Sequence, residues 1–307
     1  MEKGDKKVIR GWVFYDWANS VYNLVISSAI FPIFYNKVTE AHYLEQTGAA
    51  ALKENETVMV EFFGSQVSSS VLFSYVLSAS FLVVAILSPI LSGVADYSGN
   101  KKRFLQFFCY FGSLSAMSLF FFDVHHMELS MLSVFFASIG FWNSLVFYNA
   151  YLPEIAHLKD HDRISAKGFT MGYFGSMILL LLCLVWTQVL DYPAKYCFIF
   201  VGIWWAGFSQ ITYRVLPNNV YNRKPEKGIV SKGFKELYQV MKSFSHNKDL
   251  KRYLYSFFFF NTGVQTVMLL ATIFASKEVE WPEGGDTSGL IIAILLIQIL
   301  GAAGAFL

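Results

Sequence analysis

The stretch that decides the fold is SGVADYSGNKKR, residues 92–103, a short polar turn between two long apolar runs. The run before it, residues 62–95, has 34 residues without Asp, Glu, Lys or Arg, and the run after it, residues 104–122, has 19. Both are long enough to cross a bilayer as helices. The turn is so short that the two crossings must be antiparallel. Its glycines permit a sharp reversal of the backbone, and its three consecutive basic residues predict a cytoplasmic location.

The composition independently predicts a membrane-embedded chain. Of the 307 residues, 55% are hydrophobic, 18% are aromatic and only 15% are charged, which is too apolar for an ordinary soluble domain. The net charge of +2 argues against a nucleic-acid partner. Cys109, Cys183 and Cys197 all fall inside apolar runs, where a thiol is typically a small buried hydrophobe and not part of a disulfide or metal site.

Charge-poor runs along the chain predict eight transmembrane helices. Residues 1–10 carry four basic residues and lead into the first run without a cleavage site, which predicts a first helix that is retained and is not a signal peptide. The charge-poor runs that mark the eight helices are residues 17–36, 62–95, 104–122, 129–153, 168–190, 196–213, 253–276 and 287–307, and the first helix enters the bilayer core from Gly11. Residues 38–61 are then expected to form a long acidic external loop.

The basic residues alternate between loops as an eight-span topology requires. The N-terminus holds 4 Lys and Arg residues, the turn at 101–103 holds 3, the loop at 153–167 holds 3 and residues 214–252 hold 10, which is 20 of the 24. The opposite loops hold the other four, together with 12 of the 22 acidic residues. Because positive loops stay in the cytoplasm, the N-terminus is predicted to be cytoplasmic.

Five segments resemble a known family. The pattern Asp-x-x-Gly-Asn-Lys-Lys-Arg at residues 96–103 is similar to the loop motif between spans two and three of the major facilitator superfamily. Within that superfamily, the chain resembles the vacuole-effluxer branch in GWVFYDWANS at 11–20, FP at 31–32, NAYLPEI at 149–155 and GVQT at 263–266. The resemblance implies an all-α secondary transporter of two six-helix bundles that moves amino acids or similar small metabolites, with no cofactor and no enzymatic activity.

The sequence departs from the family pattern at two positions and lacks one residue type. Ser92 stands where the superfamily motif has a glycine, which removes support for the close helix contact made there. Thr262 stands where the branch often has an acidic residue, so no ion-handling role is carried over to it. The fourth predicted span has no arginine, which argues against proton antiport and leaves a coupling proton unproven.

The central basic segment predicts a division into two bundles. Residues 1–216 are expected to form a complete N-terminal six-helix transmembrane bundle, 217–251 a cytoplasmic basic linker with an amphipathic piece, and 252–307 the first two helices of a second bundle. The resemblance therefore implies that four further spans are missing. We expect the last two helices to cover only part of the first bundle's inner face and to leave the polar stripe of the first span open.

Polar residues of the first span are the leading candidates for a substrate pathway. Asp16 is the single acidic residue that we place inside a span, in the cytoplasmic third of the bilayer core, where a charge is costly unless it faces protein or water. Ser20, Asn23 and Ser27 follow it at helical spacing on one face, with Asn19 beside them. The alternative is that Asp16 caps a helix or pairs with a base near the membrane surface.

Four amides in other spans are further candidates for contact with a solute. Asn143 and Asn149 lie in the fourth span, and Asn261 and Gln265 lie one turn apart in the seventh. Amides in membrane helices bond to neighbouring helices at least as often as to ligands, so a structural role stands beside the functional one for each. Gly168, Gly172 and Ser176 recur every four residues in the fifth span and predict close helix packing.

A second set of residues is predicted to gate the cytoplasmic side. Glu154, at the end of the fourth span, is expected to pair with Arg163 or with another loop base. The resemblance assigns the turn after the second span to gating. The predicted gating residues are Asp96, Gly99, Lys101, Lys102, Arg103 and Glu154.

These observations predict a multi-pass secondary transporter of a small molecule that works by alternating access in a lipid bilayer. We expect it in a bacterial inner membrane, or in a vacuolar membrane of a eukaryote, and its oligomeric state is not predicted. The sequence has no phosphate-binding loop and no His-Glu-x-x-His motif, and the His125-His126 pair reads as a surface feature. An intramembrane enzyme and a membrane scaffold without transport activity are the alternatives.

Overall fold

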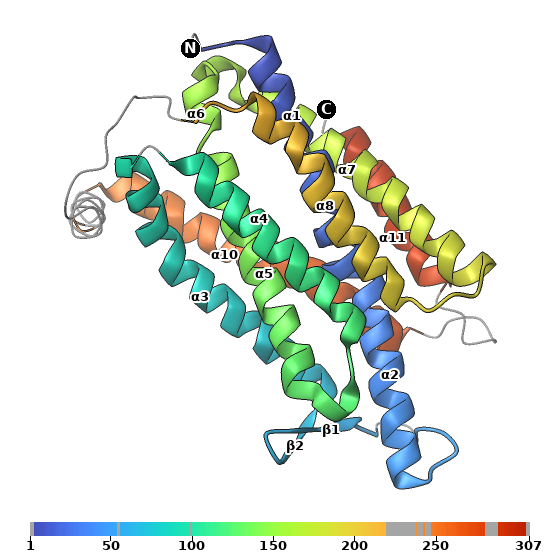
Figure 1. Ribbon diagram of the computed structural model, residues 1–307. Helices are drawn as coiled ribbons and strands as arrows, with labels where there is room; N and C mark the ends of the chain where they lie inside the picture. Colours follow the sequence, from blue (N-terminus) through green and yellow to red (C-terminus); the bar gives the residue numbers. More distant parts are fainter. Residues whose placement is uncertain are drawn as a thin grey trace.

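The computed structural model describes residues 3–53, 56–98, 100–218, 247–279 and 288–304, together with Tyr238 and Lys242. The described part is a set of long helices with one small hairpin, so the prediction of an all-α membrane protein is confirmed (Figure 1). The elements are α1 (Lys6–Val21), η1 (Tyr22–Ala29), α2 (Ile30–Thr47), β1 (Met59–Phe62), β2 (Ser65–Ser68), α3 (Ser69–Ser98), α4 (Lys101–Ser118), η2 (Leu119–Phe121), η3 (Val124–His126), α5 (Met127–Asn149), α6 (Leu152–Ile155), η4 (Leu158–Asp160), α7 (His161–Leu184), η5 (Val185–Val189), α8 (Lys195–Val215), α10 (Lys248–Glu278) and α11 (Ser288–Gly304).

The first helix is broken in its middle. Asp5 caps its N-terminus, because the Asp5 side chain accepts hydrogen bonds from the backbone N–H groups of Lys7 and Val8. The helix then changes from α- to π-helical geometry over η1. Pro32 follows three residues after η1. A proline has no N–H to donate and its ring clashes with the carbonyl one turn earlier, here that of Ser28, so the regular α-helical ladder cannot continue through this point.

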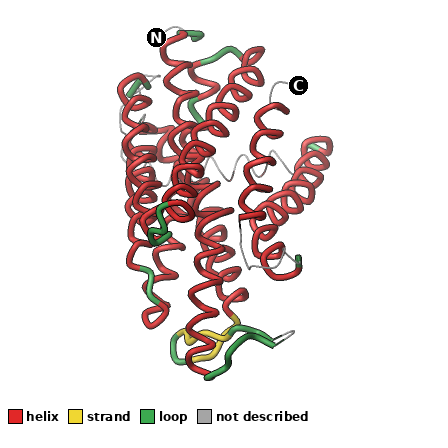
Figure 2. The backbone as a smooth tube through the Cα atoms, turned by 90° about the vertical axis from the view of Figure 1, so that its right-hand side faces the viewer, coloured by secondary structure: helices red, strands yellow, loops and turns green. Residues whose placement is uncertain are grey.

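The external segment between the first two spans differs from the prediction. The helix continues past residue 36 to Thr47, where Gly48 ends it in a left-handed conformation (φ 66°). The predicted second span was wrong at its start, because residues 59–68 form the antiparallel β1–β2 hairpin and α3 begins only at Ser69. Phe63 and Gly64 turn the hairpin with positive φ angles of 49° and 73°. The hairpin lies at the opposite end of the molecule from the N-terminus (Figure 2).

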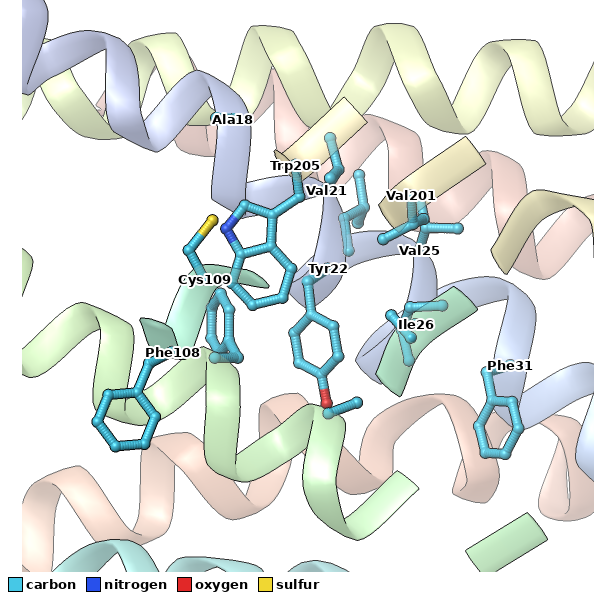
Figure 3. Close-up of a cluster of buried hydrophobic side chains, with 14 of the residues drawn as sticks. Ala18, Val21, Tyr22, Val25, Ile26, Phe31, Phe108, Cys109, Val201 and Trp205 are labelled. Atoms are coloured by element: carbon cyan, nitrogen blue, oxygen red, sulfur yellow. The ribbon is translucent and has the colours of Figure 1, made fainter. Parts of the chain in front are cut away.

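Two groups of contacts hold the helices from α1 to α8 together. In one, α4 packs against α5 and α8, and α3 packs against α5; in the other, α1 packs against α7 and α8. Gly140 on α5 approaches Gly112 on α4 so closely that a Cβ at Gly140 would clash with the Gly112 backbone. The indole of Trp205 on α8 fills the space beside Gly112. Figure 3 shows Trp205 in this core next to Tyr22 from η1 and Cys109 from α4.

The last two described helices attach to one side of this bundle. In Figure 1, α11 runs beside α7, and Gly301 packs against the ring of Tyr173. The other helix, α10, contacts η1 and α2. The basic linker predicted at 217–251 lies largely outside the described residues, so the division into bundles stays a prediction.

The outward surface of the helices is apolar. Leu82, Ile86, Leu114 and Phe169 are more than half exposed, from 57% to 64%, which fits contact with lipid. Among the described residues, five helical segments are long and apolar enough to cross a membrane, and each coincides with one of the first five predicted spans. The other three predicted spans fall on α8, α10 and α11.

Candidate transport pathway

Asp16 lies inside the protein and accepts a hydrogen bond from a tyrosine. Its side chain is only 7% exposed, and Oδ2 accepts from the hydroxyl of Tyr148 on α5 at 2.8 Å. No basic side chain pairs with Asp16 in the described residues. The alternative in which Asp16 pairs with Arg10 near the membrane surface is therefore not supported.

The tyrosine that holds Asp16 is itself fixed by aromatic neighbours. The ring of Trp12 stacks on Tyr148 with a centroid distance of 4.3 Å, and Trp12 Nε1 donates to the Tyr148 backbone carbonyl at 2.9 Å. The ring of Tyr15 lies 5.0 Å away on a tilted plane. These contacts fix the position of the Tyr148 ring and so orient its hydroxyl toward Asp16. Tyr148 could not be identified from the sequence, because a tyrosine at the end of an apolar span carries no signal of its partner.

Glycines of α7 cover the polar stripe of the first helix. A Cβ at Gly168 would clash with Oδ2 of Asp16, and one at Gly172 would clash with Oγ of Ser20. The predicted glycine packing of the fifth span is thus present, and α1 is its partner. The expectation of an open stripe is wrong at Asp16, because α7 packs against it, whereas Asn23 on the same stripe is half-buried.

Asn19 carries a buried donor without an acceptor. The residue is 1% exposed, its Oδ1 accepts from Ser20 Oγ at 3.4 Å, and its Nδ2 has no hydrogen-bond partner in the described part of the chain. An unmade hydrogen bond of a buried group costs about 1–3 kcal/mol, so such atoms occur where structure or function requires them. Asn19 therefore stands out as a buried amide whose donor is not matched by a described protein atom.

A second polar cluster surrounds the helix break. Ser80 on α3 and Ser138 on α5 are both buried and share a hydrogen bond of 2.7 Å between their hydroxyls. The hydroxyl of Tyr22 lies near Ser138 and Ser27. The sequence analysis did not single out Tyr22, Ser80 or Ser138, because hydroxyls scattered over three spans show no common spacing.

The amides of the fourth span are not equivalent. Asn143 is fully buried and joins two helices, because its Oδ1 accepts from Ser88 on α3 at 3.2 Å while its Nδ2 donates to the Ile139 carbonyl. This is the interhelical role that the sequence left open. Asn149 is exposed at the end of α5 and is not brought to the other candidates.

On α10, the two predicted amides lie on the covered face. Between Tyr253 and Gln265, every side chain is exposed except Leu254, Asn261 and Gln265, which are half-buried and share one face at spacings of seven and four. Since α10 contacts η1 and α2, this face is the side turned toward the bundle. Asn261 and Gln265 thus lie on the half-buried face of a helix that contacts η1 and α2.

Three of the predicted gating residues, Lys101, Lys102 and Glu154, form part of a connected cluster near the N-terminus. Lys101, at the start of α4, pairs with Glu154 on α6 at 2.5 Å, and both side chains are largely buried (14% and 6% exposed). Lys102 donates to the Leu216 carbonyl at the end of α8, 2.9 Å away. Arg103 is exposed. The side chain of Asp96 and the whole of Gly99 lie outside the described residues.

Additional contacts draw other segments into this cluster. Lys3 Nζ donates to the Pro153 carbonyl and the Gly4 N–H donates to the Ile155 carbonyl, each at 2.8 Å. The hydroxyl of Tyr151 donates to the Pro217 carbonyl at 3.1 Å. The N-terminus, the predicted turn, α6 and the end of α8 are therefore tied together at one end of the bundle.

The described residues give little support for a metal site or a disulfide. No group of three metal-binding side chains occurs among residues that the structure describes, and Cys109, Cys183 and Cys197 are free and buried there. His126 bonds to Asp123 at 3.1 Å on the surface. The hydrogen bond from the His125 N–H, followed by that from His126, lowers the pKa of Asp123 below its usual value.

Comparison with known proteins gives a consistent set of relatives. A family model described as "Vacuole effluxer Atg22 like" matches residues 4–307. The uncharacterized MFS-type transporter YxiO of Bacillus subtilis is 30% identical over 311 residues, which covers 98% of this chain and 67% of the relative. Autophagy-related protein 22-1 of Aspergillus fumigatus is 21% identical over 412 residues, with 98% and 67% covered. For autophagy-related protein 22 of Coccidioides immitis, the identity is 19% and the coverages are 98% and 64%.

Proposed function

Because this chain belongs to the family of vacuole effluxer Atg22-like proteins, we propose that it is a secondary transporter that moves amino acids across a membrane by alternating access. Its relatives are named as transporters, which supports passage of a small solute and not an enzymatic reaction. The observation that carries the proposal is the broken first helix, with polar side chains around the break and α10 against it.

The position of the break suits a solute site. Counted from Gly11, where the first helix is expected to enter the bilayer core, Tyr22 lies 11 residues further along the chain. A helix rises 1.5 Å per residue, so this is about 17 Å and places Tyr22 near the middle of a ~30 Å core. Transporters commonly bind substrates near this depth at interrupted helices. Asn19, Asn23, Asn261 and Gln265 come from the two helices that meet there.

The side chains at this position suit the ends of an amino acid. Amide groups both donate and accept hydrogen bonds, so Asn261 and Gln265 can bond to an α-carboxylate and to an α-ammonium. The buried carboxyl of Asp16 supplies the one acidic group of the stripe, either for the ammonium or as the carrier of a coupling proton. Asn143, bonded between helices, supports the wall of the pathway and does not contact the solute.

The gating cluster provides the second requirement of alternating access. The Lys101–Glu154 pair and the contact from Lys102 to Leu216 join α4, α6 and α8 at the predicted cytoplasmic end. Asp96 and Gly99 precede these bases in the turn, and Arg103 follows them. These bonds would stabilise the state in which they are made relative to the other state. Breaking the largely buried ion pair leaves two charges without their partners, which costs free energy.

The test is uptake of radiolabelled amino acids into liposomes that contain the protein and no ATP. We expect one or more amino acids to accumulate or exchange above the level of protein-free liposomes, with saturation at high concentration. Uptake that requires ATP would reject the secondary mechanism. Absence of flux for the whole amino-acid panel would reject the substrate class and favour a scaffold or a different solute.

A further inference from the structure

An open apolar groove runs between α7 and α8 on the outer surface of the bundle. It has a volume of about 740 Å³, which lies within the range of ligand-binding pockets. Leu182 and Ile203, on its two walls, are 53% and 59% exposed. We call it the α7–α8 groove; its lining is free of charged residues and includes Leu179, Leu182 and Val185 from α7 and Ile203, Gly207 and Ile211 from α8.

The first helix lies behind this groove, because α1 packs against both α7 and α8. Trp17 on α1 stacks on Trp204, which lines the groove, with a centroid distance of 5.6 Å. The ring of Phe14 lies 6.1 Å from that of Phe208, another lining residue. Asn19 follows Trp17 by two residues, which is about 200° around an α-helix. The groove and the proposed solute pathway are therefore on opposite sides of α1.

The last described helix covers a different side of α7. Gly301 of α11 packs against Tyr173, and Leu182 follows Tyr173 by nine residues, which is about two and a half turns. The side of α7 that meets α11 is thus opposite the side that borders the groove. Since α7 and α8 coincide with predicted membrane spans, the groove opens toward the hydrocarbon of the bilayer.

Three basic residues lie at the end of the groove that we predict to be cytoplasmic, one on each of the three helices. They are Arg10 on α1, Lys167 on α7 and Arg214 on α8, and all three are exposed. Gly11 packs against Val215. Their neighbours in the chain, Arg10 and Arg214, therefore lie at the same level of the bundle. No ion pair involves these three bases within the described part of the chain.

Helical spacing puts each base on the face that borders the groove. Arg214 follows Gly207 by seven residues, which is close to two turns, and Val185 follows Lys167 by eighteen, which is five turns. On α1, Arg10 lies four and seven residues before the two aromatic residues behind the groove. Positive charges from three helices thus converge where the apolar lining ends.

An apolar groove with a basic end matches the chemistry of an anionic phospholipid. Along α8, the groove extends from Phe200 to Ile211, which is about 17 Å and more than half of a ~30 Å bilayer core. Arginine binds phosphate through two parallel hydrogen bonds, and basic pockets between membrane helices bind lipid headgroups on the cytoplasmic side.

We propose that the α7–α8 groove binds an anionic phospholipid of the cytoplasmic leaflet, with an acyl chain against the apolar lining and the phosphate on Arg10 and Arg214. Lys167 lies deeper along the groove and supplies a further positive charge, since a lysine can extend its ammonium toward the membrane surface. The site does not depend on amino-acid transport, and its test measures lipid binding alone.

Native mass spectrometry of the purified chain, titrated with phosphatidylglycerol or phosphatidylcholine of identical acyl chains, tests the headgroup end. We expect phosphatidylglycerol to bind several-fold more tightly, and Arg10→Gln combined with Arg214→Gln to reduce its affinity to that of phosphatidylcholine. Arg252→Gln is the matched control, because Arg252 is equally exposed but lies on α10, away from the groove. Unchanged phosphatidylglycerol affinity in the double variant would overturn the proposal.

The same titration tests the acyl end through Gly207. A Cβ at Gly207 has nothing within 4 Å, so Gly207→Leu should fill the groove without a clash and weaken the binding of both lipids several-fold. Gly263→Leu on α10 has equally free space and should leave binding unchanged. Free glycerol phosphate separates a lipid site from a simple anion site, because it lacks the acyl chains and should not displace the lipid. Displacement by glycerol phosphate, or wild-type lipid affinity in Gly207→Leu, would overturn the proposal.

Discussion

Tyr148→Phe removes the hydroxyl that bonds to Asp16 and keeps the ring that stacks on Trp12. The lost bond joins a tyrosine to a buried carboxyl at 2.8 Å, and such a bond contributes about 1.5–3 kcal/mol when the carboxyl is ionised. Tyr35→Phe is the matched control, because the equally buried Tyr35 hydroxyl donates to the neutral Ser69 carbonyl, also at 2.8 Å. Its loss should cost about 0.5–1.5 kcal/mol.

The three buried free cysteines provide the assay. Their thiols are fully buried and become accessible on unfolding, so a thiol-reactive fluorescent maleimide reports the melting of the purified protein. We expect Tyr148→Phe to lower the melting temperature more than Tyr35→Phe does. In an Asp16→Asn background, the effect of Tyr148→Phe should shrink by about 1 kcal/mol, since the charged acceptor is gone. Equal effects of the two tyrosine changes would refute the claim that Tyr148 holds Asp16.

Three other changes test the packing and the gate. Gly168→Ala should destabilise the protein by about 1–3 kcal/mol in the same assay, because its Cβ meets Asp16, whereas Gly207→Ala, with nothing within 4 Å, should cost nothing. Glu154→Gln should slow uptake because it removes the buried negative charge that pairs with Lys101; unaltered uptake at equal protein abundance would remove the ion pair from the gate. Asp96→Asn should likewise impair transport without preventing membrane insertion, and normal flux would exclude a gating role.

Much of the architecture was predictable because helices that cross a bilayer require long apolar runs in the sequence. The first five predicted spans coincide with apolar helices, and the buried state of the cysteines followed from their surroundings. The errors fell where the apolar pattern does not distinguish helix from strand. Residues 62–68 carry no charge, yet Phe63 and Gly64 adopt positive φ angles and turn a hairpin there.

The candidate site was only partly predictable, since contacts between distant spans leave no trace in one sequence. Asp16 was identified because an acidic residue is energetically costly inside a membrane. Its hydrogen bond to Tyr148 and its contact with Gly168 depend on how α1, α5 and α7 pack together. Glu154 was expected to bond to a base, and the base is Lys101, because Arg163 instead pairs with Asp160 one turn away. The helix break could have been suspected from Pro32.

The central claim, an amino-acid site between the broken first helix and α10, is tested most directly by substrate uptake in variants of α10. In ATP-free liposomes, Asn261→Ala and Gln265→Ala should each weaken the apparent affinity for a transported amino acid, because both amides lie on the half-buried face of a helix that contacts η1 and α2. Thr262→Ala should keep wild-type uptake, because Thr262 is exposed and does not belong to the half-buried face. Wild-type affinity in both amide variants would contradict the account.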